Sequence, residues 1–472
     1  MTDLPISGAA SRAPTAGWRP FILRLHVYIG LFIAPFILIA ALTGTLYVLT
    51  PQIERWLYAD ALFTPASDPA LPPQPLAAQA AAARALVGPD LAFFALRPAP
   101  QPGMTTRVMF SDPALGESEN RAIFVDPVTL AVQGDMTVYG TSGILPFRIT
   151  LDYLHRNLLM GNIGRYYSEL AASWLWVAVI SGFVMWLWRP RPSTRRPALR
   201  EMPEGQRLRH LHSTIGLTIG LGLLFLSATG LTWSQLAGGR IDALRGQFGW
   251  VTPSVSLALA TPEAPVMDMP MGEHAEHMAH AAPMPTPEAA VDWLPALDAV
   301  EAAARAGGLD SPMLEIRVPK PGKAWMVREY DRSWPTQVDT LALDPASLAV
   351  TSRADFAEFT LIPKMIRWGI DAHMGVLFGL PNQILMAAIG LGLAASIAYG
   401  YRLWWRRRPA AGAMPQTLLR LWLRMGWLAR GLALLMALGF GWALPMLGFS
   451  LIAFVLLDLI RAGGFRRGAL TA

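Results

Sequence analysis

The chain carries two copies of one arrangement of motifs, and this repetition constrains its fold more than any other feature. A helical His-x-x-x-Gly-Leu motif, followed after a fixed gap by Thr-Gly, begins at His26 and again at His212. A second set recurs at a constant spacing of 218 positions: Asp126-Pro127, His155, Gly161, Gly182, Trp186 and Arg189 correspond to Asp344-Pro345, His373, Gly379, Gly400, Trp404 and Arg407. The repetition predicts an internal duplication in which each half contributes two histidines at matched places.

Composition places this duplicated chain in a lipid bilayer. Of its 472 residues, 53% are hydrophobic and only 15% are charged, which is too apolar for a soluble protein of this length. A helix needs about 20 apolar residues to span a bilayer. Six stretches approach or exceed that length: residues 21–49, 168–188, 215–236, 384–401, 427–441 and 444–460. The predicted fold class is an α-helical integral membrane protein with about six transmembrane helices.

Arginines predict how these spans are oriented. Residues 189–209 and 402–408 are rich in arginine, as is the C-terminal tail, and short basic loops remain on the cytoplasmic side. Both termini are then cytoplasmic, and the two long connections are external. The first span lacks a small-residue cleavage site, so we expect it to be retained. The pI of 9.8 needs no nucleic-acid partner, because the arginines lie beside spans, next to lipid phosphates.

Each long connection predicts a small α+β module. An alanine-rich helical run, at 76–86 or 290–306, precedes short alternating strands, and the Asp-Pro pairs predict turns that close hairpins. The predicted segments are a cytoplasmic tail (1–20), the first span (21–49), the first periplasmic module (50–150), an interfacial segment with the second span (151–188), a basic cytoplasmic loop (189–209), the third span (210–236), the second periplasmic module (237–362), an interfacial segment with the fourth span (363–408), and a C-terminal helical hairpin with a basic tail (409–472).

The chain has no cysteine, and this limits the cofactors it can hold. Disulfides, iron–sulfur clusters, thiolate zinc sites and covalently attached haem are excluded. Four histidines matched in pairs within an apolar chain instead predict two bis-histidine centres, and b-type haem is the common centre of that kind in a membrane. His26 and His212 lie at equivalent depth near the cytoplasmic ends of the first and third spans. We expect them to ligate one non-covalent haem, and His155 and His373 to ligate another on the external side.

Further cofactor-binding residues are predicted beside the inner pair. They are Gly30, Gly216, Arg24 and Arg209. The glycines follow the histidines by one helical turn and would let a porphyrin approach the backbone, although small residues there also permit close helix packing. The arginines are candidate partners for haem propionates or, alternatively, cytoplasmic anchors. His210 competes with His212, but the repeat aligns His212 with His26.

The outer histidines require a break in the helix that follows them. A continuous helix from His155 to Trp186 would be about 46 Å long, whereas the hydrocarbon core is roughly 30 Å thick. Gly161 and Gly164 in one half, and the segment 379–381 in the other, are candidate breaks. The short helix left over would fold across the outer rim and bring His155 to face His373. Alternatively, these histidines cap the boundary between module and membrane.

A Met- and His-rich insert at 267–284 has no counterpart in the first half. Thioethers bind Cu(I), and imidazoles bind Cu(II) or Zn(II). The candidate copper ligands are His274, His277, Met278 and His280. The alternative is a linker without defined metal stoichiometry, as the flanking Pro and Ala also indicate.

These motifs together resemble the PepSY-associated transmembrane family from about residue 20 to about residue 410. The resemblance lies in the His-x-x-x-Gly-Leu…Thr-Gly helix, the module closed by an Asp-Pro turn, the segment LHRNLLMG (154–161), and the helix that ends in the motif SGxxxWxWRPRP (181–192). It implies a bacterial inner-membrane protein with two PepSY-like periplasmic modules and two haems, similar to siderophore-iron reductases. The last two predicted helices lie outside it.

The predicted function is a transmembrane electron conduit. A cytoplasmic reductant or flavin reductase would supply electrons, because the chain has no nucleotide-binding Gly-rich motif of its own. A periplasmic metal chelate would accept them: a ferric siderophore, or a cupric species if the insert binds copper. Two alternatives stay open, a non-enzymatic PepSY-type regulatory or binding protein and an accessory for copper or iron uptake.

Overall fold

A computed structural model describes residues 17–64, 68, 70–189, 198–259, 292–408 and 417–468, without the side chains of 461–468. The predicted copper ligands of the insert lie outside the described residues and stay a prediction. The chain divides into two compact units. The helical unit comprises Met1–Ala41, Asn162–Arg240 and Leu391–Ala472, and the sheet unit comprises Leu42–Gly161 and Ile241–Gly390.

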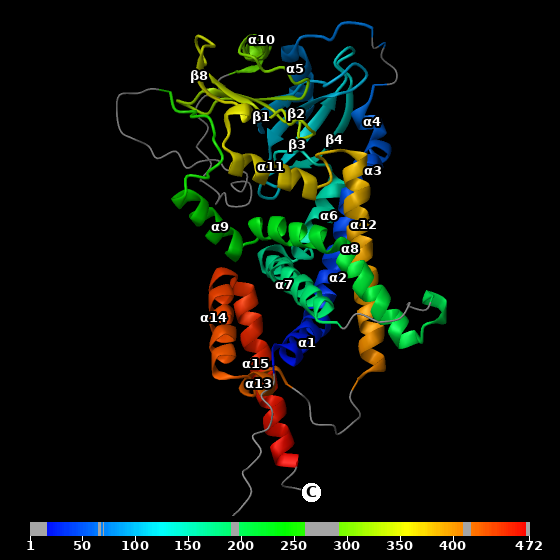
Figure 1. The fold of residues 1–472 in the computed structure, drawn as a ribbon. Helices are drawn as coiled ribbons and strands as arrows, with labels where there is room; N and C mark the ends of the chain where they lie inside the picture. Colours follow the sequence, from blue (N-terminus) through cyan, green and yellow to red (C-terminus); the bar gives the residue numbers. More distant parts are fainter. Residues whose placement is uncertain are drawn as a thin grey trace, which may run out of the picture. The chain divides into compact units, whose positions relative to one another are not determined.

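Four helical segments in the described residues are long and apolar enough to cross a membrane: Trp18–Val48, Gly161–Leu187, Glu204–Thr232 and Leu380–Arg406. They confirm four of the predicted spans (Figure 1). The first consists of α1 (Trp18–Tyr28), a π-helical turn (Ile29–Ile33) and α2 (Ala34–Val48), and the others are α7, α8 and α12. The last two predicted spans are shorter apolar helices, α14 (Trp427–Ala443) and the beginning of α15 (Pro445–Gly468). A total of six spans therefore stays a prediction.

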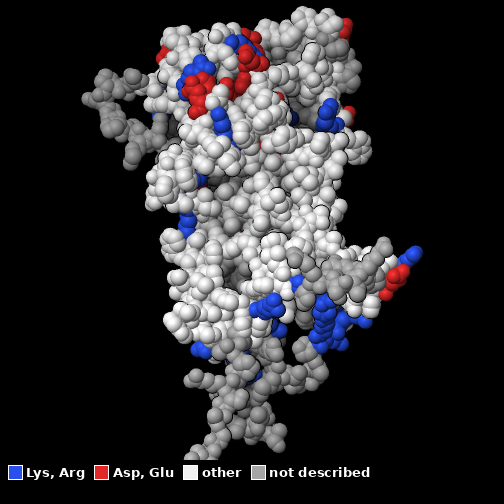
Figure 2. Space-filling view, in the orientation of Figure 1, with Lys and Arg blue, Asp and Glu red and all other residues white. Residues whose placement is uncertain are grey.

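The remaining helices are short and connect or cover the larger elements. They are α3 (Thr50–Leu57), α4 (Ala59–Leu62), α5 (Leu76–Val87), α6 (Pro146–Asn157), α9 (Leu236–Gln247), α10 (Leu297–Ala306), α11 (Leu361–His373) and α13 (Leu418–Leu423), with 3-10 turns at Leu199–Glu201, Leu294–Ala296 and Phe356–Glu358. The surface of the long helices is nearly free of charge, and basic residues gather near helix ends (Figure 2). Figure 2 shows an almost uncharged surface over the long helices, with Lys and Arg gathered near the ends of α8 and α12. This distribution is typical of helices that face lipid.

The core of the helical unit joins the first span to α7 and the C-terminal hairpin. Tyr28, Trp174 and Phe454 are buried together with apolar side chains of α13 and α15. Asp458 of α15 is only 1% exposed. One of its carboxylate oxygens accepts a hydrogen bond from the Tyr28 hydroxyl, and the other accepts one from the Leu419 N–H. Because an acid in an apolar helix is costly unless it is bonded, these contacts fasten the hairpin to the first span.

The sheet unit is built on one eight-stranded antiparallel sheet in the order β4-β3-β2-β1-β5-β6-β7-β8 (Figure 1). The strands are β1 (Ala92–Arg97), β2 (Thr106–Ser111), β3 (Glu119–Val125), β4 (Val132–Tyr139), β5 (Leu314–Arg317), β6 (Trp325–Glu329), β7 (Thr340–Leu343) and β8 (Val350–Ala354). Helices α5 and α10 cover one face, where their apolar sides pack on residues from both halves of the chain. The predicted alanine-rich helices and short strands are therefore present.

The two halves of the sheet follow the same plan. In each half a helix precedes four strands, and the third and fourth strands are joined at an Asp-Pro pair. Asp126 accepts hydrogen bonds from the N–H groups of Val128 and Thr129, and Asp344 accepts them from Ala346 and Ser347. The sequence predicts one module in each connection. The structure instead merges them into a single sheet, because β1 pairs with β5.

The joint between the two halves is a buried ion pair. Arg97 of β1 and Glu315 of β5 are 2% and 1% exposed, and the Arg97 Nε donates to a Glu315 oxygen at 2.7 Å. Arg317 and Arg328 also contact this carboxylate. Burial alone would raise the pKa of Glu315, but the three guanidinium groups hold it well below its ordinary value. The carboxylate therefore stays charged inside the joint.

We predict that Glu315→Gln destabilises the protein by about 3–5 kcal/mol, because it leaves Arg97 buried without its counter-charge. The control is Asp135→Asn, which removes the partner of Arg121 in a pair that is 33% and 36% exposed. An exposed pair contributes at most about 1 kcal/mol. Thermal unfolding in detergent compares the two variants. Equal losses of stability would contradict the assignment of the joint.

The pH dependence of the same variant has a definite sign. The folded pKa of Glu315 lies below its ordinary value of 4.5, so the unfolded chain takes up the proton first on acidification. The stabilisation is complete above about pH 4.5 and is lost as the pH falls toward the folded pKa. The difference in melting temperature between wild type and Glu315→Gln should be constant near neutrality and shrink below that pH.

Candidate functional site with two histidine pairs

The first pair lies within the helical unit. His26 on α1 and His212 on α8 are both half-buried, and their ring centroids are 6.1 Å apart with an interplanar angle of 79°. Two imidazoles that share one metal ion, with metal–nitrogen bonds of about 2 Å, have ring centroids about 6 Å apart. The spacing of His26 and His212 therefore fits two side chains that would hold one metal ion.

Hydrogen bonds at Nδ1 define the protonation of both rings. The His212 Nδ1 lies 2.8 Å from the Ser396 carbonyl oxygen, which can only accept, so Nδ1 carries the proton. The His26 Nδ1 lies 2.8 Å from the Ser181 Oγ, and that hydroxyl donates to the Ala178 carbonyl at 3.0 Å. Ser181 consequently accepts from His26. In both rings Nε2 keeps its lone pair, as a metal ligand requires.

Glycines on the neighbouring helices make room for these rings. A Cβ added at Gly182 would lie 3.3 Å from the His26 Cε1, and one added at Gly400 would lie 3.4 Å from the His212 Cε1. Each ring thus packs directly against the backbone of α7 or α12. Gly182 and Gly400 are separated by the repeat spacing of 218 residues, and so are Ala178 and Ser396. The Ala178 carbonyl accepts from Ser181, and the Ser396 carbonyl accepts from His212. The glycine contacts are equivalent in the two halves, whereas His212 bonds its carbonyl directly and His26 bonds its own through Ser181.

The second pair lies within the sheet unit. His155 and His373 stand in the last turns of α6 and α11, which follow the fourth strand of each half. The His155 Nδ1 lies 3.1 Å from the Thr43 Oγ1, and a Cβ added at Gly44 would lie 3.0 Å from the His155 Cε1. The water-poor surroundings of His373 and the nearby His155 lower the pKa of His373 to about 3. His373 is thus neutral, and able to ligate a metal, throughout the physiological range.

The predicted helix breaks follow both outer histidines. Helix α6 ends at Asn157, the next two residues have positive φ angles, and α7 begins at Gly161, whose φ is +60°. In the second half α11 ends at His373, and α12 begins at Leu380 directly after Gly379, whose φ is +59°. Gly161 and Gly379 therefore lie at breaks. Gly164 lies inside α7, so its predicted role as a break is wrong, because the chain has already turned at 158–161.

Other predicted residues lie near the inner pair without contacting its rings. A Cβ at Gly30 would meet no atom within 4 Å, and one at Gly216 would meet only the Ser396 Oγ, at 3.9 Å. Arg24 stacks over the Tyr28 ring at 4.8 Å, and Arg209 is exposed. Their cofactor-binding roles stay predictions. The structure places His212, rather than His210, against His26.

Several neighbours of the histidines were not selected from the sequence. They are Thr43, Gly44, Ser181, Gly182, Ser396 and Gly400. The glycines and Thr43 belong to the repeated motifs, so the repeated sequence pattern already carried a signal for them. The repeat carries no such signal for Ser181 and Ser396, because they hold the rings from non-equivalent positions. In the part of the chain that the structure describes, no group of three or more His, Asp or Glu side chains is suited to a metal ion.

The histidine pairs and the sheet fall within a region that matches a known protein family. A family model described as the PepSY-associated TM region matches residues 23–407. The chain belongs to this family. The match includes all four histidines and the whole eight-stranded sheet, and α13, α14 and α15 lie beyond it. No curated protein matches the chain at a significant level.

We predict that Gly44→Ala displaces the His155 ring and costs about 1–3 kcal/mol, because the new methyl group overpacks a tight contact. Gly30→Ala is the matched control. It adds the same methyl group to the same helical span, where it meets no atom, and should change stability by no more than about 0.5 kcal/mol. Thermal unfolding gives the stability, and peptide mapping after treatment with diethyl pyrocarbonate gives the reactivity of His155. An unaltered His155 reactivity in Gly44→Ala would contradict the packing.

Proposed function

We propose that this family member is a di-haem electron conduit of the bacterial inner membrane. The observation that supports the proposal most directly is the inner pair, in which two imidazoles lie at a bis-ligand spacing and each gives its Nδ1 proton to a neighbouring helix. His26 and His212 would hold the haem, which would then supply one-electron transfer without binding oxygen. We also propose that the chain arose by internal duplication, that it has six membrane spans, and that its two haem centres are stacked across the membrane.

The residues of the inner pair would orient the ligands. The Ser396 carbonyl and the Ser181–Ala178 chain fix the tautomer and the rotation of each ring, which raises the basicity of Nε2. Gly182 and Gly400 allow each imidazole to rest on a helix backbone, so that ring movement is restricted. Rigid ligands suit electron transfer, because the geometry of the site then changes little between oxidation states.

The residues of the outer pair would perform the same task on the periplasmic side. Thr43 contacts the His155 Nδ1, and the low pKa of His373 keeps its ring from becoming cationic. His26 lies near the beginning, and Thr43-Gly44 near the end, of the first span. One pair would then serve each end of the membrane.

The direction of electron flow follows from the arginine-rich loops. Short basic loops tend to remain in the cytoplasm, so both termini would be cytoplasmic, and a cytoplasmic reductant or flavin reductase would supply electrons to the inner pair. The outer pair would pass them to a periplasmic metal chelate. A ferric siderophore is the preferred acceptor, since Fe(II) binds hard oxygen donors more weakly than Fe(III) does. A cupric acceptor requires the Met- and His-rich insert to bind copper.

Haem content of the purified protein tests the proposal. We expect two equivalents in the wild type, one equivalent after His26→Ala or His212→Ala, and one after His155→Ala or His373→Ala. Reduced-minus-oxidised spectra should show which centre each variant has lost. His210→Ala is the control and should keep both equivalents.

Two results would reject the conduit. One is unchanged haem content in all four histidine variants. The other is colourless protein after expression with ample haem, which would favour a non-enzymatic PepSY-type regulatory or binding protein, or an accessory for metal uptake.

A further inference from the structure

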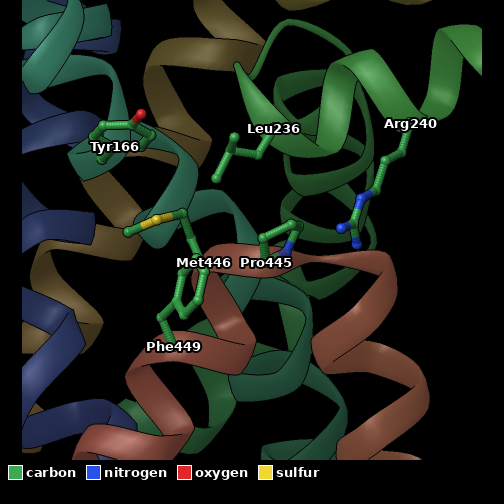
Figure 3. Close-up of a pocket in the computed structure, with 6 residues that line it drawn as sticks. All are labelled: Tyr166, Leu236, Arg240, Pro445, Met446 and Phe449. Carbon is green, nitrogen blue, oxygen red and sulfur yellow. The ribbon is translucent and has the colours of Figure 1, made fainter.

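A hollow in the helical unit combines an apolar lining with a single cation. It has a volume of about 520 Å³ and is lined by Tyr166, Leu236, Arg240, Pro445, Met446 and Phe449. Figure 3 shows Arg240 reaching from α9 toward the turn that begins α15. The six lining residues include one positive charge and no acid. A site with this composition suits a molecule that joins an anionic group to an apolar chain.

Buried contacts fix the walls of this hollow. Glu169 of α7 is fully buried, and its two carboxylate oxygens accept the Leu236 and Ala237 N–H groups, which positions the beginning of α9. On the opposite wall, the Trp174 Nε1 donates to the Ser450 Oγ at 2.7 Å and holds the first turns of α15 against α7. The hollow is therefore bounded by elements that buried polar bonds keep in place.

The polar groups at the hollow retain capacity to bind a ligand. Arg240 is exposed and stacks over Trp442, with its Cζ 5.3 Å from the ring centroid. To the residues that the structure describes, the Arg240 guanidinium makes no hydrogen bond or ion pair, and the Tyr166 hydroxyl makes no hydrogen bond. Arginine beside tryptophan, at the ends of apolar helices, is typical of the level where lipid headgroups lie.

We propose that this hollow binds one anionic phospholipid. The Arg240 guanidinium bonds the phosphate in the forked geometry that suits it, and the Tyr166 hydroxyl is a second donor. An acyl chain lies along Leu236, Met446 and Phe449, where the apolar side chains replace neighbouring lipid. Because α7 and α9 form one wall and α15 the other, the bound lipid bridges the family region and the C-terminal hairpin. The proposal does not depend on haem.

Lipid retention by the full-length protein tests this site. Native mass spectrometry would measure binding of phosphatidylglycerol and of phosphatidylcholine with identical acyl chains after delipidation in detergent. We expect the wild type to retain phosphatidylglycerol preferentially. Arg240→Gln removes the charge-assisted hydrogen bonds of the guanidinium and should weaken that binding by about tenfold or more, while phosphatidylcholine binding stays unchanged. Tyr166→Phe should have a smaller effect in the same direction.

Arg55→Gln is the matched control. Arg55 is also exposed and stacks on an aromatic ring, that of Phe63 at 5.5 Å, but it lines no part of the hollow. An equal loss of phosphatidylglycerol in Arg55→Gln would show general charge attraction and overturn the proposal. A melting temperature of Arg240→Gln equal to the wild type, in the absence of lipid, confirms that the variant is folded.

Two competition experiments distinguish the lipid from other ligands. Inorganic phosphate should displace phosphatidylglycerol only weakly, because it lacks the acyl chains. Decylubiquinone should not displace it, because a quinone has no anionic group for Arg240. Displacement by phosphate at concentrations similar to those of the lipid would reduce the site to an anion site. Arg240-dependent displacement by the quinone would replace the lipid proposal with a quinone site.

Discussion

The structure depends on one constraint: polar groups in a water-free environment must find their partners inside the protein. Several buried polar side chains in the helical unit illustrate it. Asp458 bonds Tyr28 and the beginning of α13, and Glu169 bonds the beginning of α9. His26 and His212 give their Nδ1 protons to the neighbouring helices, either directly or through Ser181. Such bonds specify how the apolar helices pack, because hydrophobic contacts alone favour many arrangements.

The same constraint explains why histidine is accompanied by glycine in this fold. An imidazole that rests on a helix backbone can reach a carbonyl of that helix and expose less of its surface to lipid. A position without a Cβ eases this contact most at Gly44, where an added Cβ would lie 3.0 Å from the ring, and less at Gly182 and Gly400, where it would lie 3.3 Å and 3.4 Å away. The repeated motifs therefore include histidines and the glycines of other helices on which the imidazole rings pack.

In the sheet unit, two positions at the repeat spacing carry opposite charges. Arg97 and Glu315 occupy equivalent positions in the two halves, separated by the repeat spacing of 218 residues, and they meet where β1 pairs with β5. Two identical halves would place like charges opposite each other at this point. Here the two matched positions hold an arginine and a carboxylate. The ion pair between Arg97 and Glu315 therefore stabilises the joint between the two halves of the sheet.

The sequence by itself determined the features that depend on composition and periodicity. Long apolar stretches gave the four confirmed spans, Asp-Pro pairs gave the hairpin turns, and paired histidines with their repeated glycines gave the family and the candidate ligands. The tertiary structure alone decided which surfaces meet. The two expected modules form one sheet, because β1 pairs with β5. Ser181 and Ser396 hydrogen-bond the histidines, and Asp458 accepts from Tyr28. These contacts join residues far apart in the chain, and local patterns cannot specify them because each depends on the packing of whole helices and strands.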